Sequence, residues 1–222
     1  MYFFNQVNVL INTKNSSRQI DHNRIGLSPI LQRLFALVGL VMISPLLLIV
    51  ALWIAFESPG NVIFKQIRVG EQGRRFNFYK FRSMRTPKDP KYVDVSQLAS
   101  DRDGVCNKFF NDPRVTRVGK FIRKYSIDEL PQLINVVKGD MLLIGPRPAL
   151  LSETDQYSML ARKRLATMPG LTGLWQVSGR ANTTFEEQIE LDIRYVKEKN
   201  WVYDLKILFA TIPVVLFGKG AY

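Results

Sequence analysis

The pattern of hydrophobic and polar positions is dominated by one uncharged apolar run, Leu34–Phe56, which lies between Arg33 and Glu57. As a helix, a run of this length reaches across the hydrocarbon core of a bilayer. Its middle carries Ser44-Pro45. Proline removes a backbone donor and clashes with the preceding turn, and a serine hydroxyl can bond to a carbonyl one turn earlier. The run therefore predicts a membrane helix that is kinked or broken at this dipeptide.

Basic residues flank the run on both sides. The positive-inside rule places Lys- and Arg-rich flanks in the cytoplasm, so both ends favour the same side of the membrane. A helix broken at Ser44-Pro45 that enters the bilayer and returns satisfies this rule. An ordinary kinked span does not, but the run alone leaves it open. The flanking residues are Arg18, Arg24 and Arg33 before the run, and Lys65, Arg68, Arg74, Arg75, Lys80, Arg82, Arg85 and Lys88 after it.

Two short strands are predicted after the apolar run. Residues alternate over Val62–Val69 and again over Arg75–Phe81, and Gly70–Gly73 between them supplies a turn, which is the pattern of a β-hairpin. Most of the remaining chain has helical character, so we expect an α+β fold that is rich in helices. The further expectations are a polar surface loop over 87–111, helices over 127–137, 152–168 and 185–199, a stiff segment over 145–148, and a turn over 169–173.

The last long segment, Trp201–Phe217, is largely apolar but carries Asp204 and Lys206 and is interrupted by Pro213. These features suit a helix that lies at the membrane interface better than one that spans the bilayer. We therefore divide the chain into a lead-in (1–28), a membrane helix (29–58) and a cytoplasmic domain that ends in the interfacial helix (59–222).

Charge and composition limit the kinds of partner and metal that the protein could bind. The chain has 222 residues, with 31 Lys and Arg against 19 Asp and Glu, and its net charge of +12 favours an anionic partner. Nucleic acid is disfavoured because the basic residues lie beside a membrane run and form no recognisable nucleic-acid-binding motif. A single Cys106 and a single His22 exclude an intramolecular disulfide and a cysteine- or histidine-rich metal site. Any metal should be a hard cation such as Mg²⁺.

The best candidate for chemistry is the acidic pair Asp128-Glu129, in the stretch from Ser126 to Gln132. Adjacent carboxylates repel each other unless something positive uses them. A structural interpretation is a capping box, in which Ser126 and Glu129 close the start of a helix. The functional interpretation uses the same geometry: a helix start faces anions and keeps carboxylates ionised. An ionised aspartate can attack phosphorus while its neighbour holds Mg²⁺.

Four basic residues could serve the same chemistry. Lys80 and Arg82 alternate along a strand and share one face, which suits a diphosphate, although a solvated edge strand carries such charges too. Arg147 lies between two prolines that limit its backbone, which presets the guanidinium to chelate a phosphate; a structural pair with a carboxylate is the alternative. Arg123 could steady a phosphate or be an ordinary surface arginine.

Motifs of one known family follow each other in order along the chain. They are Phe64-Lys-Gln-x-Arg-x-Gly70, Tyr79-Lys-Phe-Arg-Ser-Met84, Asp112-x-Arg-x-Thr-x-x-Gly119, Arg123-x-x-Ser-x-Asp-Glu-Leu-Pro-Gln132, Asn135-Val-x-x-Gly-Asp-Met141, Gly145-Pro-Arg-Pro148, Pro169-Gly-Leu-Thr-Gly-x-Trp-Gln176, Gly179-Arg180 and Asp192-x-x-Tyr195. On these motifs the chain resembles, from about Ser28 onward, the bacterial sugar transferases. These are monotopic polyprenyl-phosphate phosphoglycosyl transferases, and the resemblance is to their small, catalytic-core form.

The resemblance implies a mechanism. Asp128 would attack the β-phosphorus of a UDP-sugar and release UMP, and the phosphate of a polyprenyl phosphate would then take the phospho-sugar from the carboxylate. Glu129 would bind Mg²⁺, and Arg123 and Arg147 would hold phosphates. The resemblance further marks Lys80, Asp192 and Asp204 as functionally sensitive positions, and it favours the re-entrant form of the membrane helix.

The resemblance also implies a setting. The enzyme would act at the cytoplasmic face of the bacterial inner membrane, in the first membrane step of exopolysaccharide, O-antigen or other glycan assembly. Its partners would be UDP-sugar, polyprenyl phosphate, membrane lipid, a second copy in a homodimer and downstream glycosyltransferases. Leu142 departs from the family, which usually has a serine there. Two rivals stay open: a non-catalytic membrane-anchored binder of anionic lipid or nucleotide, and a phosphatase acting on the lipid carrier. The sequence does not identify the sugar.

Overall fold

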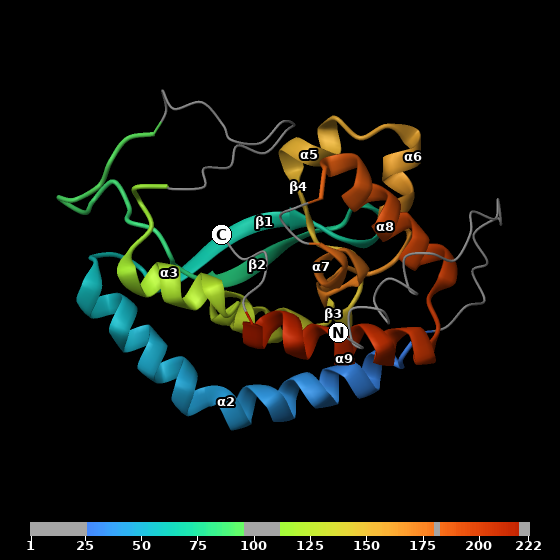
Figure 1. Cartoon of the computed structure of the whole chain (residues 1–222), viewed down its shortest axis with the longest axis horizontal. Coiled ribbons are helices and arrows are strands. Elements are labelled where there is room, and N and C mark those ends of the chain that lie inside the picture. Colours follow the sequence, from blue (N-terminus) through green and yellow to red (C-terminus); the bar gives the residue numbers. More distant parts are fainter. Residues whose placement is uncertain (1–25, 96–111, 180–182, 218–222) are drawn as a thin grey trace.

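The computed structural model describes residues 26–95, 112–179 and 183–217. The expected lead-in up to residue 25, which includes His22, lies outside the described residues, as do Cys106, Arg180 and residues 96–111 of the expected loop over 87–111. In the described parts, a long apolar helix lies along one side of a mixed α/β body that contains a small sheet (Figure 1).

The apolar helix is α2, Pro29–Glu57, and it runs through Pro45 without interruption. Figure 1 shows it bent in its middle, and the Ser44 hydroxyl donates to the carbonyl of Val41 at 2.8 Å. The predicted kink is therefore confirmed, as a bend rather than a break. Within the described residues this is the helix that is long and apolar enough to cross a membrane, judged by length and composition.

Both ends of α2 are hydrogen-bonded to the same body. Near its start, the buried Gln32 side chain accepts from the backbone N–H groups of Leu143 and Ile144 at 2.9 and 3.2 Å. At its end, the Glu57 carboxylate accepts from the backbone N–H of Val118 at 2.8 Å, in helix α3 (Arg117–Lys124). These bonds fix where the helix begins and ends relative to the body.

The predicted hairpin is confirmed. Strands β1 (Ile63–Val69) and β2 (Arg75–Phe81) pair antiparallel over their whole length, with Phe64 opposite Lys80. The short turn η1, Glu71–Gly73, connects them. The two-residue strand β4, Ala149–Leu150, adds to the far end of β1 and gives the sheet order β2-β1-β4.

The outer edge of β2 is covered by one asparagine. Asn135 is fully buried in helix α4 (Leu133–Lys138), and its amide donates to the carbonyl of Asn77 at 2.6 Å and accepts from the N–H of Tyr79 at 3.2 Å. The side chain thus takes the place of a neighbouring strand for two edge groups, which would otherwise need other partners. The same contact holds α4, and the segment before it, against β2.

The expected turn over 169–173 is wrong in part. Gly170–Thr172 forms strand β5, which pairs parallel with β3, Leu142–Ile144. The approach is so close that a Cβ on Gly170 would lie 2.0 Å from the backbone nitrogen of Gly145, so only glycine fits there. Leu142 contributes its backbone N–H to the carbonyl of Pro169 at 2.8 Å, a bond that does not depend on its side chain.

The rest of the chain is helical, and the helical character expected over 152–168 is confirmed, although not as one continuous helix. Three short elements carry it, because the chain turns at Gln156 and the helix tightens from α to 3₁₀ after Arg162: α5 (Leu151–Asp155), α6 (Met159–Arg162) and η3 (Lys163–Ala166). The expected helix over 185–199 is confirmed as α8, Phe185–Glu198, which begins with a capping box between Thr184 and Glu187. Between them lies α7, Leu174–Ser178.

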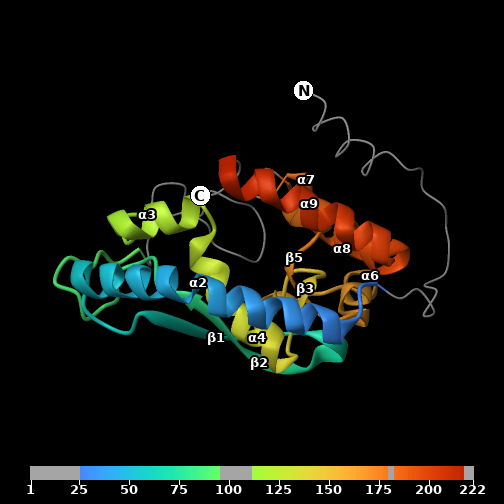
Figure 2. The same cartoon turned by 90° about the horizontal axis from the view of Figure 1, so that it is seen from below.

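Helix α9, Trp201–Phe217, continues through Pro213. Figures 1 and 2 show that α9 and α2 both lie on the same side of the molecule. Both helices leave large apolar side chains exposed on the described surface, an arrangement typical of contact with a membrane or partner. On α9 these side chains are Trp201, Val202, Phe209, Ile212, Leu216 and Phe217.

Candidate active site

The segment that carries Asp128 and Glu129 is a tight 3₁₀ turn, η2 (Ile127–Gln132), rather than the start of an α-helix. Ser126 before it adopts a left-handed conformation with φ of 55° and makes no side-chain capping bond. The predicted capping box is therefore wrong, and the α-helix begins only at Leu133. The left-handed residue turns the chain from α3 into η2 and directs Asp128 inward.

Asp128 is buried, with 8% of its surface exposed. Burial, and after it the negative charge of Glu129, raises the pKa of its carboxyl group to about 7. The positive charges of Lys80 and Arg123 act in the opposite direction. The expectation that a helix start keeps this carboxylate fully ionised is therefore wrong, because removal from water outweighs the nearby positive charge.

Lys80 faces the same pair from strand β2. Burial lowers the pKa of its ammonium group, the charges of Asp128 and Glu129 raise it, and those of Arg147 and Arg123 lower it again. Five charged residues from four parts of the chain thus act on one another. We call them the Asp128 cluster: Lys80, Arg123, Asp128, Glu129 and Arg147. The structure brings these five predicted residues together.

Arg147 is oriented by a tryptophan ring that is itself hydrogen-bonded. Its guanidinium lies over the ring of Trp175 in α7, 5.4 Å from the centroid. The indole N–H of Trp175 in turn donates to the hydroxyl of Thr183 at 2.6 Å. A cation over an indole face is attracted by the ring quadrupole, so the tryptophan orients the arginine as well as packing the core.

Arg82 lies outside the Asp128 cluster. Strand β2 ends at Phe81, and the buried Arg82 side chain turns to the end of the apolar helix, where it donates to the carbonyl of Ser58 at 2.7 Å and to that of Pro59. Burial lowers its pKa, and Asp89 is the charge that acts against this. The expectation that Lys80 and Arg82 share an open face is therefore wrong, because the strand does not continue past Phe81.

Two further predicted residues, Asp192 and Asp204, are also buried and bonded to protein groups. Asp192 of α8 forms an ion pair with Arg164; burial raises the pKa of its carboxyl group to about 6, and Arg164 opposes the rise. Asp204 of α9 accepts from the N–H of Leu27 at 2.7 Å and from the hydroxyl of Tyr195 at 2.8 Å. Both carboxylates therefore have structural partners, and Asp204 ties α9 to the residues just before the apolar helix.

Asp128 and Glu129 are the carboxylates of the cluster that could hold a cation. Among the described residues, no group of three or more His, Cys, Asp or Glu side chains converges as a metal site. Mg²⁺ is commonly held by one or two carboxylates together with substrate phosphates and water. The half-buried Glu129 beside Asp128 fits this arrangement, in which the substrate supplies the missing oxygen ligands.

Comparison of the sequence with known protein families identifies the family of this chain. The model of the family described as bacterial sugar transferase matches residues 24–218, which includes every part of the Asp128 cluster. The chain belongs to the bacterial sugar transferase family. The family resemblance predicted from the motifs is thereby confirmed.

Three relatives illustrate the range of this family. The chain is 48% identical over 172 residues to the galactosyl transferase CpsE of Streptococcus agalactiae, covering 74% of this chain and 37% of the relative. It is 44% identical over 207 residues to the undecaprenyl-phosphate galactose phosphotransferase of Salmonella typhimurium, covering 88% and 42%. It is 38% identical over 192 residues to the exopolysaccharide production protein ExoY of Rhizobium meliloti, covering 85% of each. The chain thus spans less than half of the first two relatives and most of the third.

Sequence reasoning gave no individual role to two residues that support the site. Arg164 is fully buried between α8 and the segment that carries Arg147. In the sequence it is the last of three consecutive basic residues and looks like part of a solvated helix face. Arg68 on β1 is buried as well, although it had been counted among the flanking basic residues. Only the tertiary contacts distinguish these arginines from surface ones.

Proposed function

We propose that this protein transfers a sugar 1-phosphate from a UDP-sugar to a polyprenyl phosphate, through a covalent intermediate on Asp128. The observation that carries the proposal is a buried aspartate, with a pKa of about 7, beside a second carboxylate and within electrostatic reach of Lys80 and Arg123, while Arg147 acts on Lys80. Anionic nucleophile and anionic diphosphate repel each other, so the cations are what makes such an attack feasible. The name of the Salmonella relative, an undecaprenyl-phosphate galactose phosphotransferase, supports this class of reaction, and that of the Streptococcus relative, a galactosyl transferase, supports transfer of a sugar.

In the first step, a carboxylate oxygen of Asp128 attacks the β-phosphorus of the UDP-sugar. The bond from that phosphorus to the bridging oxygen breaks, and UMP leaves with the bond's electron pair. Arg123, Arg147 and Lys80 offset the charge on the diphosphate oxygens and orient them for attack. The pKa near 7 leaves Asp128 partly ionised at neutral pH, and binding of cations would increase the ionised share.

In the second step, a phosphate oxygen of the polyprenyl phosphate attacks the same phosphorus. The acyl phosphate bond breaks, the Asp128 carboxylate is regenerated, and the product is a polyprenyl diphospho-sugar. Two half-reactions at one nucleophile allow a water-soluble donor and a lipid acceptor to react in turn. The protein would then act at the first membrane step of a glycan pathway, and the name of ExoY, an exopolysaccharide production protein, supports a pathway of this kind.

The proposed magnesium ion would be held by Glu129 and Asp128. When bound, it would supply positive charge to the diphosphate oxygens and so stabilise the leaving UMP. The residues of the chain keep their own tasks in this scheme: Asp128 forms the bond, and the arginines and lysine position the phosphates.

A re-entrant α2 would present this site at the level of the lipid headgroups. The helix is bent at its middle, and both of its ends are hydrogen-bonded to one body, through Gln32 and Glu57. A helix that crossed the bilayer would carry its two ends to opposite surfaces. Exposed apolar residues of α9 would lie at the interface on the same side (Figure 2). We propose the cytoplasmic face of the bacterial inner membrane, where nucleotide sugars are made.

The test is a measurement of UMP release from a panel of UDP-sugars by the detergent-solubilised protein. The wild type should release UMP with at least one sugar, and the intact mass should rise by one hexose phosphate or its N-acetylated equivalent when acceptor is withheld. Asp128→Asn should abolish both signals, while Asp155→Asn, an exposed aspartate of α5, should keep them. Nucleotide binding without UMP release would instead support a non-catalytic binder, and release of inorganic phosphate from the lipid carrier would support a phosphatase.

A further inference from the structure

The segment that carries Arg147 is held by its backbone carbonyls. Prolines on both sides of Arg147 have no N–H, so at those two positions the carbonyl is the one backbone group that can accept or donate a hydrogen bond. Four carbonyls between Ile144 and Pro148 are bonded to different elements of the fold. Ile144 accepts from the hydroxyl of Tyr195 at 3.3 Å, Pro146 from the N–H of Gly170 at 2.8 Å, Arg147 from the guanidinium of Arg164 at 3.1 Å, and Pro148 from the guanidinium of Arg68 at 3.3 Å.

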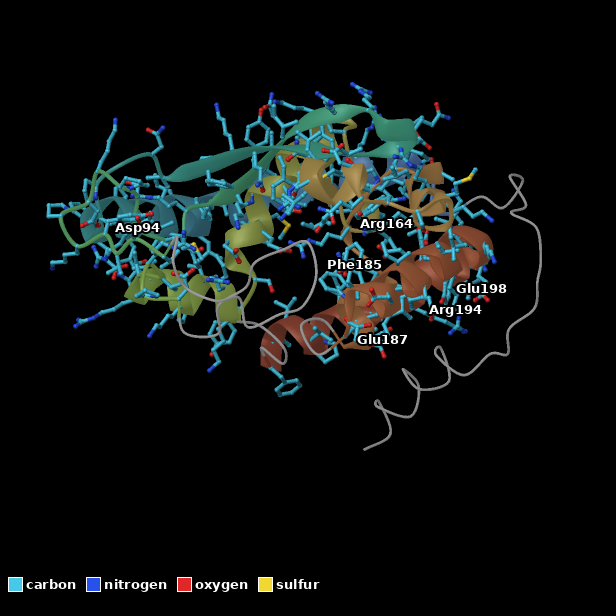
Figure 3. All side chains as sticks on the ribbon, turned by 90° about the horizontal axis from the view of Figure 1, so that it is seen from above. Asp94, Arg164, Phe185, Glu187, Arg194 and Glu198 are labelled. Atoms are coloured by element: carbon cyan, nitrogen blue, oxygen red, sulfur yellow. The ribbon has the colours of Figure 1, made fainter. Side chains whose placement is uncertain are left out.

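Arg164 is the more deeply buried of the two arginines, with 1% of its surface exposed. Figure 3 shows it inside the molecule, between α8 and the short helices α5 and α6. Its guanidinium donates to the hydroxyl of Tyr157, to the carboxylate of Asp192 and to the carbonyl of Arg147. A buried charge needs such partners, and only the planar fork of arginine reaches all three at once.

Arg68 reaches the same segment from a different element. It lies on β1 with 6% of its surface exposed, and its guanidinium is 5.1 Å from the centroid of the Phe78 ring. It donates to the carbonyl of Pro148, the residue after Arg147. Two guanidinium groups, one from β1 and one from η3, therefore donate hydrogen bonds to the consecutive carbonyls of Arg147 and Pro148.

We infer that Arg164 and Arg68 are positioning residues for Arg147, with Asp192 as the counter-ion of Arg164. The flanking prolines already stiffen the segment internally, because a residue before proline is confined to extended conformations. The segment from Pro146 to Pro148 could still move as a rigid unit. The hydrogen bonds from Arg164 and Arg68 prevent that movement. The guanidinium of Arg147 is then kept over Trp175 and within reach of Lys80.

This inference rests on the proposed function, in which Arg147 holds a phosphate of the UDP-sugar. It also gives Asp192 a different task from substrate binding. An error of about 1 Å in the position of a group that orients a substrate can cost on the order of 100-fold in rate. Loss of the hydrogen bonds that Arg164 and Arg68 donate to this backbone should therefore lower the rate of catalysis as well as the stability of the protein.

The test is a double-mutant cycle between Arg164→Lys and Arg147→Ala, with kcat and KM for UDP-sugar measured by UMP release. Lysine keeps the charge but loses the fork, so Arg164→Lys should lower kcat/KM by about 10-fold or more. If Arg164 acts through Arg147, the same change in the Arg147→Ala protein should alter kcat/KM by less than about two-fold. An equal loss in both backgrounds, or no loss in either, would overturn the inference, because a general structural role does not depend on Arg147.

Two further variants keep the result decisive. Arg162→Lys changes an exposed arginine two residues away and should leave kcat/KM and melting temperature unchanged. Arg68→Lys repeats the cycle from the neighbouring carbonyl and decides the matter if circular dichroism shows that Arg164→Lys does not fold. Loss of the fold in both Arg164→Lys and Arg68→Lys would assign the arginines to stability and overturn the inference. Absence of UMP release by the wild type would refute the proposed function itself, and with it the role of Arg147.

Discussion

Glu57, the last residue of the apolar helix, accepts a hydrogen bond from the backbone N–H of Val118 at 2.8 Å, and a second one from that of Arg117 at 2.7 Å. The first N–H groups of a helix have no partner within the helix, and a carboxylate is a favourable acceptor for them. Helix α3, which begins here, also carries Arg123 of the Asp128 cluster. One side chain therefore couples the end of the apolar helix to the helix that carries Arg123.

Replacing Glu57 should weaken this coupling. Glu57→Ala removes the acceptor for both N–H groups, and we expect it to lower the free energy of unfolding by about 1–2 kcal/mol, as for loss of a helix cap. Glu57→Gln keeps one amide oxygen and should lose less. The measurement is urea unfolding in detergent, with Glu71→Ala in the exposed turn η1 as the control that should change little. Equal stability of Glu57→Ala and wild type would show that the contact does not hold α3.

Ionisation of Asp128 at high pH should destabilise the folded state. Its folded pKa of about 7 lies above its ordinary value of 3.8, so the neutral form is favoured in the folded state. The stability linked to this group is fully present below its ordinary pKa and is lost as the pH rises through about 7. Asp128→Asn cannot ionise, so its melting temperature should exceed that of the wild type more at pH 8 than at pH 5.

The same variant should have no UMP release, so the gain in stability would accompany a complete loss of activity. Asp155→Asn serves as the matched control and should melt with the wild type at both pH values. A melting difference for Asp128→Asn that does not depend on pH would contradict the raised pKa.

The pH dependence of UMP release should report the neighbours of Asp128. Because the nucleophile must be ionised, kcat/KM should rise with pH with an inflection near 7 in the free enzyme. Glu129 raises the pKa of Asp128, so Glu129→Gln should move the inflection to lower pH; Lys80 lowers it, so Lys80→Met should move it to higher pH. Both variants should also be slower, and the direction of the shift is the result that matters. Shifts in the same direction would contradict the assignment.

Lys80 and Arg82 are two residues apart, yet their loss should have different consequences. Lys80→Met should lower kcat/KM strongly with little effect on melting, because it removes a cation from the cluster. Arg82→Met leaves the carbonyls of Ser58 and Pro59 without this donor, and should cost about 1–3 kcal/mol in stability while the folded fraction stays active. Thermal melting and UMP release on the same samples separate the two. A strong loss of activity in fully folded Arg82→Met would show that Arg82 contributes to the active site after all.

The sequence pattern predicted those features of the fold that depend on neighbouring residues in the chain. Alternation over residues 62–81 predicted the hairpin, and the uncharged run with Pro45 predicted the bent apolar helix. Of the residues predicted for the site, Asp128, Glu129, Lys80, Arg123 and Arg147 do lie together. Arg82, Asp192 and Asp204, which were predicted with them, are bonded to other protein groups.

The errors arose where long-range contacts decide. The pairing of β5 with β3 joins segments that have no local signal for a strand, and it depends on the closeness of Gly145 and Gly170. The role of Ser126 was misjudged because its left-handed conformation, set by the turn from α3, prevents the capping bond. Arg164 was overlooked because its burial comes from α8, a helix far along the chain.

The topology of the apolar helix can be tested with cysteines at its two ends. Ser28 and Asn61 are exposed just before and after α2, and both ends of the helix are bonded to one body. In a Cys106→Ser background, Ser28→Cys and Asn61→Cys should both react with a membrane-impermeant maleimide in inside-out vesicles and both be protected in intact spheroplasts. Leu46→Cys, next to the bend, should be protected from the reagent in both preparations, because it would lie within the lipid. Reaction of the two terminal cysteines from opposite sides would show that the helix crosses the membrane, and the bonds of Gln32 and Glu57 to the same body could not then both exist in the bilayer.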